Sequence, residues 1–157
     1  MKYKIAINGF GRIGRLTFRS FLERNLKDVK IVAINDLGSI DSNLHLLKYD
    51  SIHGELNEKF EVTNNKLLIS NEEVIFSNEP DPLKLNWKKL GVNLVIESTG
   101  RFTKRADAQK HIDSGAKKVL ISAPASDPDI TVVYGINQEK VNENHKIISN
   151  GSCTTNC

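Results

Sequence analysis

An α/β fold with a doubly wound, mostly parallel sheet and an antiparallel hairpin insertion is predicted by three features of this sequence. Short runs rich in Ile and Val alternate with amphipathic helical patterns along most of the 157 residues. Three glycines, at positions 9, 11 and 14, separate the first such run from the first helical pattern. Closely spaced strand patterns with polar flanks interrupt the alternation near the middle of the chain. The length suits a single domain.

The first 36 residues are predicted to form a βαβ unit. Residues 3–8 have the pattern of a buried strand, and residues 29–34 form a second, β-branched strand that ends at Asn35-Asp36. Between them, residues 11–25 have a helical pattern whose apolar face is supplied mainly by Ile13, Leu16, Phe18, Phe21 and Leu22. We expect the crossover of this unit to be right-handed.

A short helix over residues 41–49 is expected next, with Ser39 or Asp41 as its N-cap. Residues 53–78 are then interpreted as an excursion from the parallel fold. The hairpin pattern around Asn64-Asn65 predicts antiparallel strands over residues 59–62, 67–69 and 74–76.

The second half resumes the parallel pattern after Pro80 and Pro82 break off the excursion. A helix is expected over residues 104–114, with Gly115 as its C-terminal stop. The strands predicted before and after this helix lie at residues 92–97, 118–122, 131–133 and 146–148.

The composition excludes several classes of protein. The 22 basic and 19 acidic residues, a net charge of +3, are scattered, which argues against a nucleic-acid-binding surface. No apolar run approaches the ~20 residues of a membrane helix, and no signal peptide is evident, so we expect a cytoplasmic protein without a membrane partner. Two cysteines alone cannot ligate a structural zinc ion, and no metal site is expected.

The three glycines have the G-x-G-x-x-G spacing of a dinucleotide-binding turn. Gly9 would let the chain turn off the strand, Gly11 would admit a pyrophosphate to the backbone, and Gly14 would let the helix lie close to the sheet. Asp36 lies 22 residues past Gly14, where a carboxylate accepts hydrogen bonds from an adenosine ribose and repels a 2′-phosphate. Together these residues favour NAD over NADP. Taken alone, Asp36 is equally well interpreted as a turn or cap residue.

Two further segments, Glu97-Ser98-Thr99-Gly100 and Ser122-Ala123-Pro124-Ala125, follow buried strand patterns directly. Ligands of open parallel sheets bind beyond the carboxyl ends of the strands, so both segments are candidate cofactor contacts. The alternative is that these small residues only form tight turns between strand and helix.

Cys153 follows the strand pattern over 146–149 and precedes Thr154-Thr155-Asn156, which can open a helix. A helix N-terminus stabilises a thiolate and can hold an oxyanion, so Cys153 is a candidate nucleophile. The competing interpretation is an unreactive, partly buried cysteine. We expect Cys157, one turn further along, to face the packed side of the helix. No catalytic base is evident. We interpret all four histidines as surface or packing residues: His45, His53, His111 and His145.

Six segments of the chain carry a joint resemblance to one enzyme family. They are Asn8-Gly9-Phe10-Gly11-Arg12-Ile13-Gly14-Arg15, Asn35-Asp36-Leu37, Leu46-Leu47-Lys48-Tyr49-Asp50-Ser51-Ile52-His53-Gly54, Glu97-Ser98-Thr99-Gly100, Ile121-Ser122-Ala123-Pro124-Ala125 and Ser152-Cys153-Thr154-Thr155-Asn156-Cys157. Together they resemble the phosphorylating glyceraldehyde-3-phosphate dehydrogenases, from residue 3 to the last residue. Pro80, where many relatives have a basic residue, and the loop over 38–41 depart from the family pattern.

The resemblance implies a Rossmann-type NAD-binding domain over residues 1–152, with residues 153–157 starting a helix of the catalytic domain. The pyrophosphate would lie on the backbone around Arg12 and Ile13, and the adenosine ribose on Asp36. The residues that the resemblance assigns to NAD are Asn8, Gly9, Phe10, Gly11, Arg12, Ile13, Gly14, Asp36, Ser98, Thr99, Gly100 and Ser122.

The resemblance also implies a glycolytic reaction. Cys153 would form a hemithioacetal with glyceraldehyde 3-phosphate, hydride transfer to NAD would leave a thioester, and inorganic phosphate would release 1,3-bisphosphoglycerate. The hydroxyls of Ser152 and Thr154 would help to hold phosphate. Family members are much longer, and their second half supplies the catalytic histidine and most of a homotetramer interface. We therefore expect the isolated chain to bind NAD without turnover.

Two alternatives stay open. Erythrose-4-phosphate dehydrogenase shares these motifs and is separated from the first family chiefly by features of the second half. The chain also fits a stand-alone NAD-binding or redox-sensing module in which Cys153 and Cys157 respond to oxidation.

Overall fold

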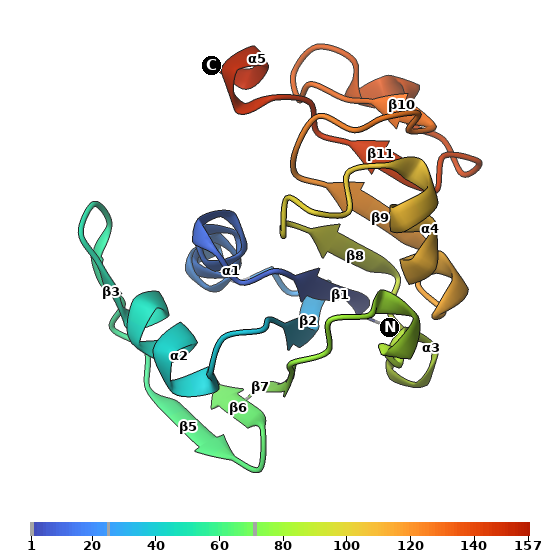
Figure 1. Cartoon of the computed structure of the whole chain (residues 1–157). Helices are drawn as coiled ribbons and strands as arrows, with labels where there is room; N and C mark the ends of the chain where they lie inside the picture. Colours follow the sequence, from blue (N-terminus) through green and yellow to red (C-terminus); the bar gives the residue numbers. More distant parts are fainter. Residues whose placement is uncertain (1, 25, 71) are drawn as a thin grey trace.

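The computed structural model describes residues 2–24, 26–70 and 72–157, and one large β-sheet forms its centre (Figure 1). From edge to edge, the strands of this sheet are β10 (Ile130–Thr131), β11 (Ile147–Ser149), β9 (Lys118–Ile121), β8 (Leu94–Glu97), β1 (Tyr3–Asn8), β2 (Val29–Asn35), β7 (Glu72–Ser77), β6 (Lys66–Ile69) and β5 (Phe60–Thr63). Neighbours from β10 to β7 pair in parallel, and the last two pairings are antiparallel. The predicted α/β class is confirmed.

The winding of the sheet reverses at its middle. From β1 the chain proceeds to β2 and β7 on one side, and then returns to β8, β9 and β11 on the other side. In sheets of this kind the ligand lies in the crevice at the carboxyl ends of the strands where the order reverses. A separate antiparallel pair, β3 (Tyr49–Asp50) and β4 (Gly54–Glu55), lies outside the main sheet.

Helices cover both faces of the sheet (Figure 1). The helical elements are α1 (Arg12–Arg24), α2 (Ile40–Lys48), α3 (Trp87–Leu90), α4 (Arg105–Asp113) and α5 (Cys153–Asn156), with 3₁₀ turns η1 (Pro82–Lys84) and η2 (Gln138–Lys140). None of the described helices has the length and apolar character needed to cross a lipid bilayer.

The two faces of β1 contribute to different cores because successive side chains of a strand point in opposite directions. Ile7 packs in a cluster with Phe18 of α1, whereas Ala6 packs in a cluster with Trp87 of α3. Phe10, just after β1, is fully buried, and its ring lies 5.8 Å from the rings of both Phe18 and Phe76 in edge-on contact. This aromatic cluster anchors the turn that follows β1.

The first unit is close to its prediction. The strand over 3–8 and the helix from residue 11 are observed as β1 and α1, while the predicted helix end at residue 25 lies outside the described residues. The assignment of Ile13 to the buried helix face is wrong, because this side chain at the start of α1 is 49% exposed. Of the two N-cap candidates for α2, the structure has Ser39, whose hydroxyl accepts a hydrogen bond from the Ser42 amide at 3.2 Å.

The excursion over residues 53–78 is only partly confirmed. β5 and β6 form the expected antiparallel hairpin, with the left-handed conformation at both Asn64 and Asn65, which asparagine tolerates in such turns. β7 pairs with β6 in the expected antiparallel arrangement, but its other edge pairs in parallel with β2, so β7 joins the hairpin to the parallel strands. Val74 and Phe76 of β7 are buried in the same cluster as α1. The acidic residues at the start of β7 gave the strand a polar flank that concealed this burial.

The second half follows its prediction with two differences. α4 and its neighbouring strands are observed, and Gly115 ends α4 with a φ of +107°. The strand expected over 131–133 stops at Thr131, because the Val133 amide donates to the Asn137 side chain at 2.8 Å and the chain turns away. The short helix α3 was not predicted, since four residues are too few for a periodic pattern.

Candidate cofactor site

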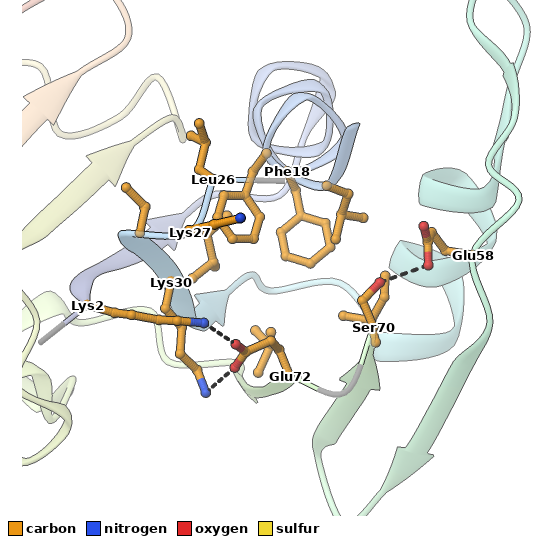
Figure 2. Close-up of a pocket in the computed structure, with 14 residues that line it drawn as sticks. Lys2, Phe18, Leu26, Lys27, Lys30, Glu58, Ser70 and Glu72 are labelled. Carbon is orange, nitrogen blue, oxygen red and sulfur yellow. Dashed lines mark hydrogen bonds and ion pairs between the residues drawn. The ribbon is translucent and has the colours of Figure 1, made fainter. Parts of the chain in front are cut away.

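A cavity of about 260 Å³ lies at the carboxyl ends of β1, β2 and β8, where the winding of the sheet reverses. It is lined by Asn8, Gly9, Gly11, Asn35, Asp36, Leu37, Glu79, Pro80, Ser98, Thr99, Arg101 and Phe102. A larger cavity, of about 520 Å³, lies at the opposite ends of the strands, beside Lys2, Val29 and Lys30 (Figure 2). Figure 2 shows Lys2 and Lys30 directed toward Glu72, with ion pairs of 2.7 and 2.5 Å. The smaller cavity has the position expected of a cofactor site.

The glycine turn between β1 and α1 forms one wall of the smaller cavity. Gly9 has a φ of +91°, and a Cβ atom there would stand 2.6 Å from the backbone nitrogen of Thr99. A Cβ atom on Gly14 would stand 2.2 Å from the carbonyl oxygen of Gly9. A Cβ atom on Gly11 would meet nothing within 4 Å, because this position faces open space. Gly9 and Gly14 are therefore needed for close packing, and Gly11 leaves room for a ligand.

The start of α1 supplies hydrogen-bond donors at this wall. The first four amides of a helix have no partner within it, and their dipoles make the N-terminus a binding site for anions. α1 begins at Arg12, so the amides around Gly11, Arg12 and Ile13 are at its positive end. A pyrophosphate matches this arrangement in charge and in its need for donors.

Asp36 holds the neighbouring wall in place. Its carboxylate accepts hydrogen bonds from the amides of Phe10 and Gly38, at 2.7 and 2.8 Å, and from the side chain of Asn43 at 3.1 Å. Partial burial acts to raise the pKa of Asp36, but these hydrogen bonds, together with the nearby charge of Arg15, lower the pKa below its usual value. A carboxylate at this position accepts hydrogen bonds from ribose hydroxyls, and its negative charge repels a 2′-phosphate.

The other residues assigned to the cofactor by resemblance differ in their surroundings. Asn8, Ser98 and Thr99 line the cavity, whereas the Phe10 side chain lies in the core and only its backbone is near the site. The Arg12 guanidinium pairs with Asp50 at 2.6 Å.

Two more of these residues lie at turns. Gly100 has a φ of +73° with open space at its Cβ position. The Ser122 amide donates to the Glu97 carbonyl at 3.0 Å, and Ser122 is not among the residues that line the cavity.

Sequence reasoning missed several participants. Glu97 was noted only as part of a turn, and His111 only as a surface or packing residue. In the structure both are fully buried, and they hydrogen-bond each other at 2.9 Å directly below the cavity. The Thr99 amide donates to Glu97 at 2.8 Å. Nothing in a single sequence reveals these contacts, because the residues lie on different elements.

The second candidate, Cys153, is the first residue of α5. Ser152 caps this helix, and its hydroxyl accepts a hydrogen bond from the Thr154 amide at 3.3 Å. Cys153 and Cys157 are both free and exposed, so the expectation that Cys157 faces a packed surface is wrong. α5 is a single turn at the end of the described chain and has no neighbour that would bury its inner side (Figure 1).

Comparison with known protein families identifies the family of this chain. The profile of the glyceraldehyde 3-phosphate dehydrogenase NAD-binding domain matches residues 3–105. The chain belongs to this family. The resemblance noted in the sequence and the prediction of NAD as cofactor are therefore confirmed.

Curated relatives support the same assignment to the glyceraldehyde-3-phosphate dehydrogenase family over a longer range. The enzymes of Geobacillus stearothermophilus and Priestia megaterium are 53% and 55% identical over 158 aligned residues, which cover 100% of this chain and 47% of each relative. The Thermotoga maritima enzyme is 53% identical over 153 residues, 98% of this chain and 46% of its own length. The chain thus spans about half the length of the curated relatives it matches.

Proposed function

We propose that this chain is the NAD-binding part of a phosphorylating glyceraldehyde-3-phosphate dehydrogenase. The whole protein would oxidise glyceraldehyde 3-phosphate, with NAD and inorganic phosphate as co-substrates, and would assemble as a homotetramer. The observation that carries this proposal is the cavity in which the open side of Gly11, the start of α1 and the Asp36 carboxylate converge. The family match supports the proposal, and so does the sequence identity of more than 50% to glyceraldehyde-3-phosphate dehydrogenases.

The residues of the cavity match the chemistry of NAD. The amides at the start of α1 would bind the pyrophosphate over Gly11, where no side chain intervenes. Asp36 would accept hydrogen bonds from hydroxyls of the adenosine ribose, and Ser98 and Thr99, which line the cavity, would lie along the remainder of the cofactor. Gly100 and Ser122, outside the lining of the cavity, would lie further along the same cofactor. When bound, NAD supplies the acceptor for a hydride.

We assign residues 1–152 to a cofactor domain and residues 153–157 to the start of the catalytic domain. Within the second segment, Cys153 would be the nucleophile. Its thiolate sulfur adds to the aldehyde carbon, and the carbonyl oxygen takes up a proton to give a hemithioacetal. Loss of a hydride from that carbon and a proton from that oxygen leaves a thioester. A phosphate oxygen then attacks the thioester carbon, and the sulfur leaves as thiolate. The hydroxyls of Ser152 and Thr154 would hold phosphate during this step.

Cys153 is expected to react with iodoacetamide several times faster than Cys157. Both thiols are exposed, so access does not distinguish them, but Cys153 lies at the positive, amino end of α5 and Cys157 follows its negative, carboxyl end. Peptide mass mapping after brief labelling measures the two rates.

Cys153→Ser and Cys157→Ser serve as matched controls for this labelling. Equal labelling of both thiols, or faster labelling of Cys157, would remove the support for Cys153 as nucleophile. The same preparation should form no NADH from substrate, because none of the histidine hydrogen bonds among the described residues reaches Cys153.

A further inference from the structure

A row of polar side chains, three of them buried and one half-buried, crosses the sheet directly below the cofactor cavity. Ser77, Asn35, Asn8 and Glu97 are the last residues of β7, β2, β1 and β8, and they are partners in the registers of these strands. The Ser77 hydroxyl donates to Asn35 at 2.8 Å, the Asn35 amide donates to Asn8 at 2.8 Å, and the Asn8 amide donates to Glu97 at 2.6 Å. Every hydrogen bond of this polar row is donated toward Glu97.

The backbone fixes the direction of the polar row at one end. The Glu79 amide donates to the Asn35 side-chain oxygen, and the Asn35 side-chain nitrogen donates to the Glu79 carbonyl, both at 2.9 Å. A backbone N–H cannot accept and a carbonyl cannot donate, so the side chain of Asn35 has one possible orientation. The orientation of Asn8 follows from it, because Asn8 must present its oxygen to Asn35.

An indole fixes the direction at the other end. The Trp87 Nε1–H donates to Nδ1 of His111 at 3.0 Å, and an indole nitrogen can only donate. His111 therefore carries its proton on Nε2, from which it donates to Glu97 at 2.9 Å.

Glu97 is where these donors converge. One carboxylate oxygen accepts from Asn8 and His111, and the other accepts from the Thr99 amide at 2.8 Å and from the Thr99 hydroxyl. Three of these four groups are unable to accept a hydrogen bond here. Glu97 is only 1% exposed, so water does not replace any of them. The position requires two acceptor oxygens, which a carboxylate provides and an amide does not.

This arrangement sets the shape of the cavity. The Thr99 backbone lies so close to Gly9 that a Cβ atom on Gly9 would stand 2.6 Å from its nitrogen, and the Ser98 hydroxyl donates to the Gly9 carbonyl at 2.7 Å. Glu97 thereby holds the turn at Thr99 against the glycine turn. At the other end of the polar row, Asn35 holds Glu79, which lines the same cavity.

We propose that Glu97 is a positioning residue for NAD, whose carboxylate fixes the turn at Thr99 in the geometry that the cofactor needs. The inference rests on the proposed position of NAD over that turn. It assigns to Glu97 a role that no neutral residue of the same size can fill.

Glu97→Gln tests this role, because the amide has the same shape but presents one NH₂ group. In one orientation of the glutamine side chain, the NH₂ group faces the donors of Asn8 and His111. In the other orientation, it faces the backbone N–H of Thr99. We expect the affinity for NAD in calorimetry to fall by about tenfold or more, because a buried donor is left unpaired at the cavity wall. Where the NH₂ group faces Thr99, the Thr99 amide should also lose its protection from hydrogen exchange.

Ser149→Ala is the matched control. It removes a hydrogen bond of a buried side chain on β11, from the Ser149 hydroxyl to the Ala123 carbonyl at 2.8 Å, and leaves the polar row and the bonds from Glu97 to Thr99 in place. We expect a lower unfolding temperature with an NAD affinity within about twofold of the original chain. If both variants lose affinity equally, or if Glu97→Gln binds NAD normally, the positioning role is wrong. If the unaltered chain fails to bind NAD, the proposed function is wrong as well.

The unaltered chain gives a second test that does not depend on a variant folding. The ¹⁵N chemical shifts of His111 should show a proton on Nε2 and none on Nδ1. A proton on Nδ1, or a doubly protonated ring, would contradict the direction of the polar row and overturn the inference.

Discussion

Gly11→Val is expected to abolish measurable NAD binding while leaving the fold intact. A Cβ atom on Gly11 meets nothing within 4 Å, so a side chain there begins in open space. It would, however, fill the space through which the pyrophosphate reaches the amides at the start of α1. We expect the affinity in isothermal titration calorimetry to fall by more than about a hundredfold. The circular dichroism spectrum and unfolding temperature should change little.

Gly14→Ala provides the contrast for this substitution. Its Cβ atom would stand 2.2 Å from the Gly9 carbonyl, so helix and turn must move apart, and the expected effect is a loss of stability. Normal NAD binding by Gly11→Val would show that the pyrophosphate lies elsewhere.

Asp36→Asn is expected to remove the preference for NAD over NADP. The substitution deletes the charge that repels a 2′-phosphate, and it disturbs the hydrogen bonds from Phe10 and Gly38 that the carboxylate accepts. We expect the affinity for NAD to fall by about tenfold and the affinity for NADP to change much less. Calorimetric titrations with both cofactors measure the ratio.

Asp41→Asn is the control for charge alone. Asp41 is an exposed carboxylate in the first turn of α2 and does not line the cavity. The Asp41→Asn substitution should leave the affinities for NAD and for NADP unchanged. If the Asp36→Asn variant kept the original preference for NAD over NADP, a group other than Asp36 would be responsible for that preference.

The parts of the site that the sequence predicted are those carried by local patterns. Gly9 and Gly11 lie in the turn before α1 and Gly14 lies in its first turn, and their spacing follows from the geometry of a strand that leads into a helix. Asp36 directly follows the next strand, so its position relative to the glycines is fixed by a single βαβ unit. Such features need no knowledge of distant contacts.

The parts that were missed depend on contacts between distant segments. Glu97 and His111 are 14 positions apart, and Asn8 is 89 positions from Glu97, yet all three share one hydrogen-bonded cluster. Periodicity reports whether a residue is buried, but it does not report which polar partner it meets. The parallel pairing of β7 escaped prediction for a related reason, because it depends on β2 and on a core cluster shared with α1, both distant from β7 in the sequence.

A two-dimensional ¹H–¹⁵N NMR titration of the unaltered chain with NAD tests the central claim most directly. NAD bound in the smaller cavity should shift the amides of Gly11, Arg12 and Ile13 together with those of Asp36 and Thr99. The amides beside the larger cavity at Lys30 and Glu72 should keep their positions. Shifts confined to that larger cavity, or the absence of any shift at saturating NAD, would contradict the assignment of the cofactor to the glycine turn.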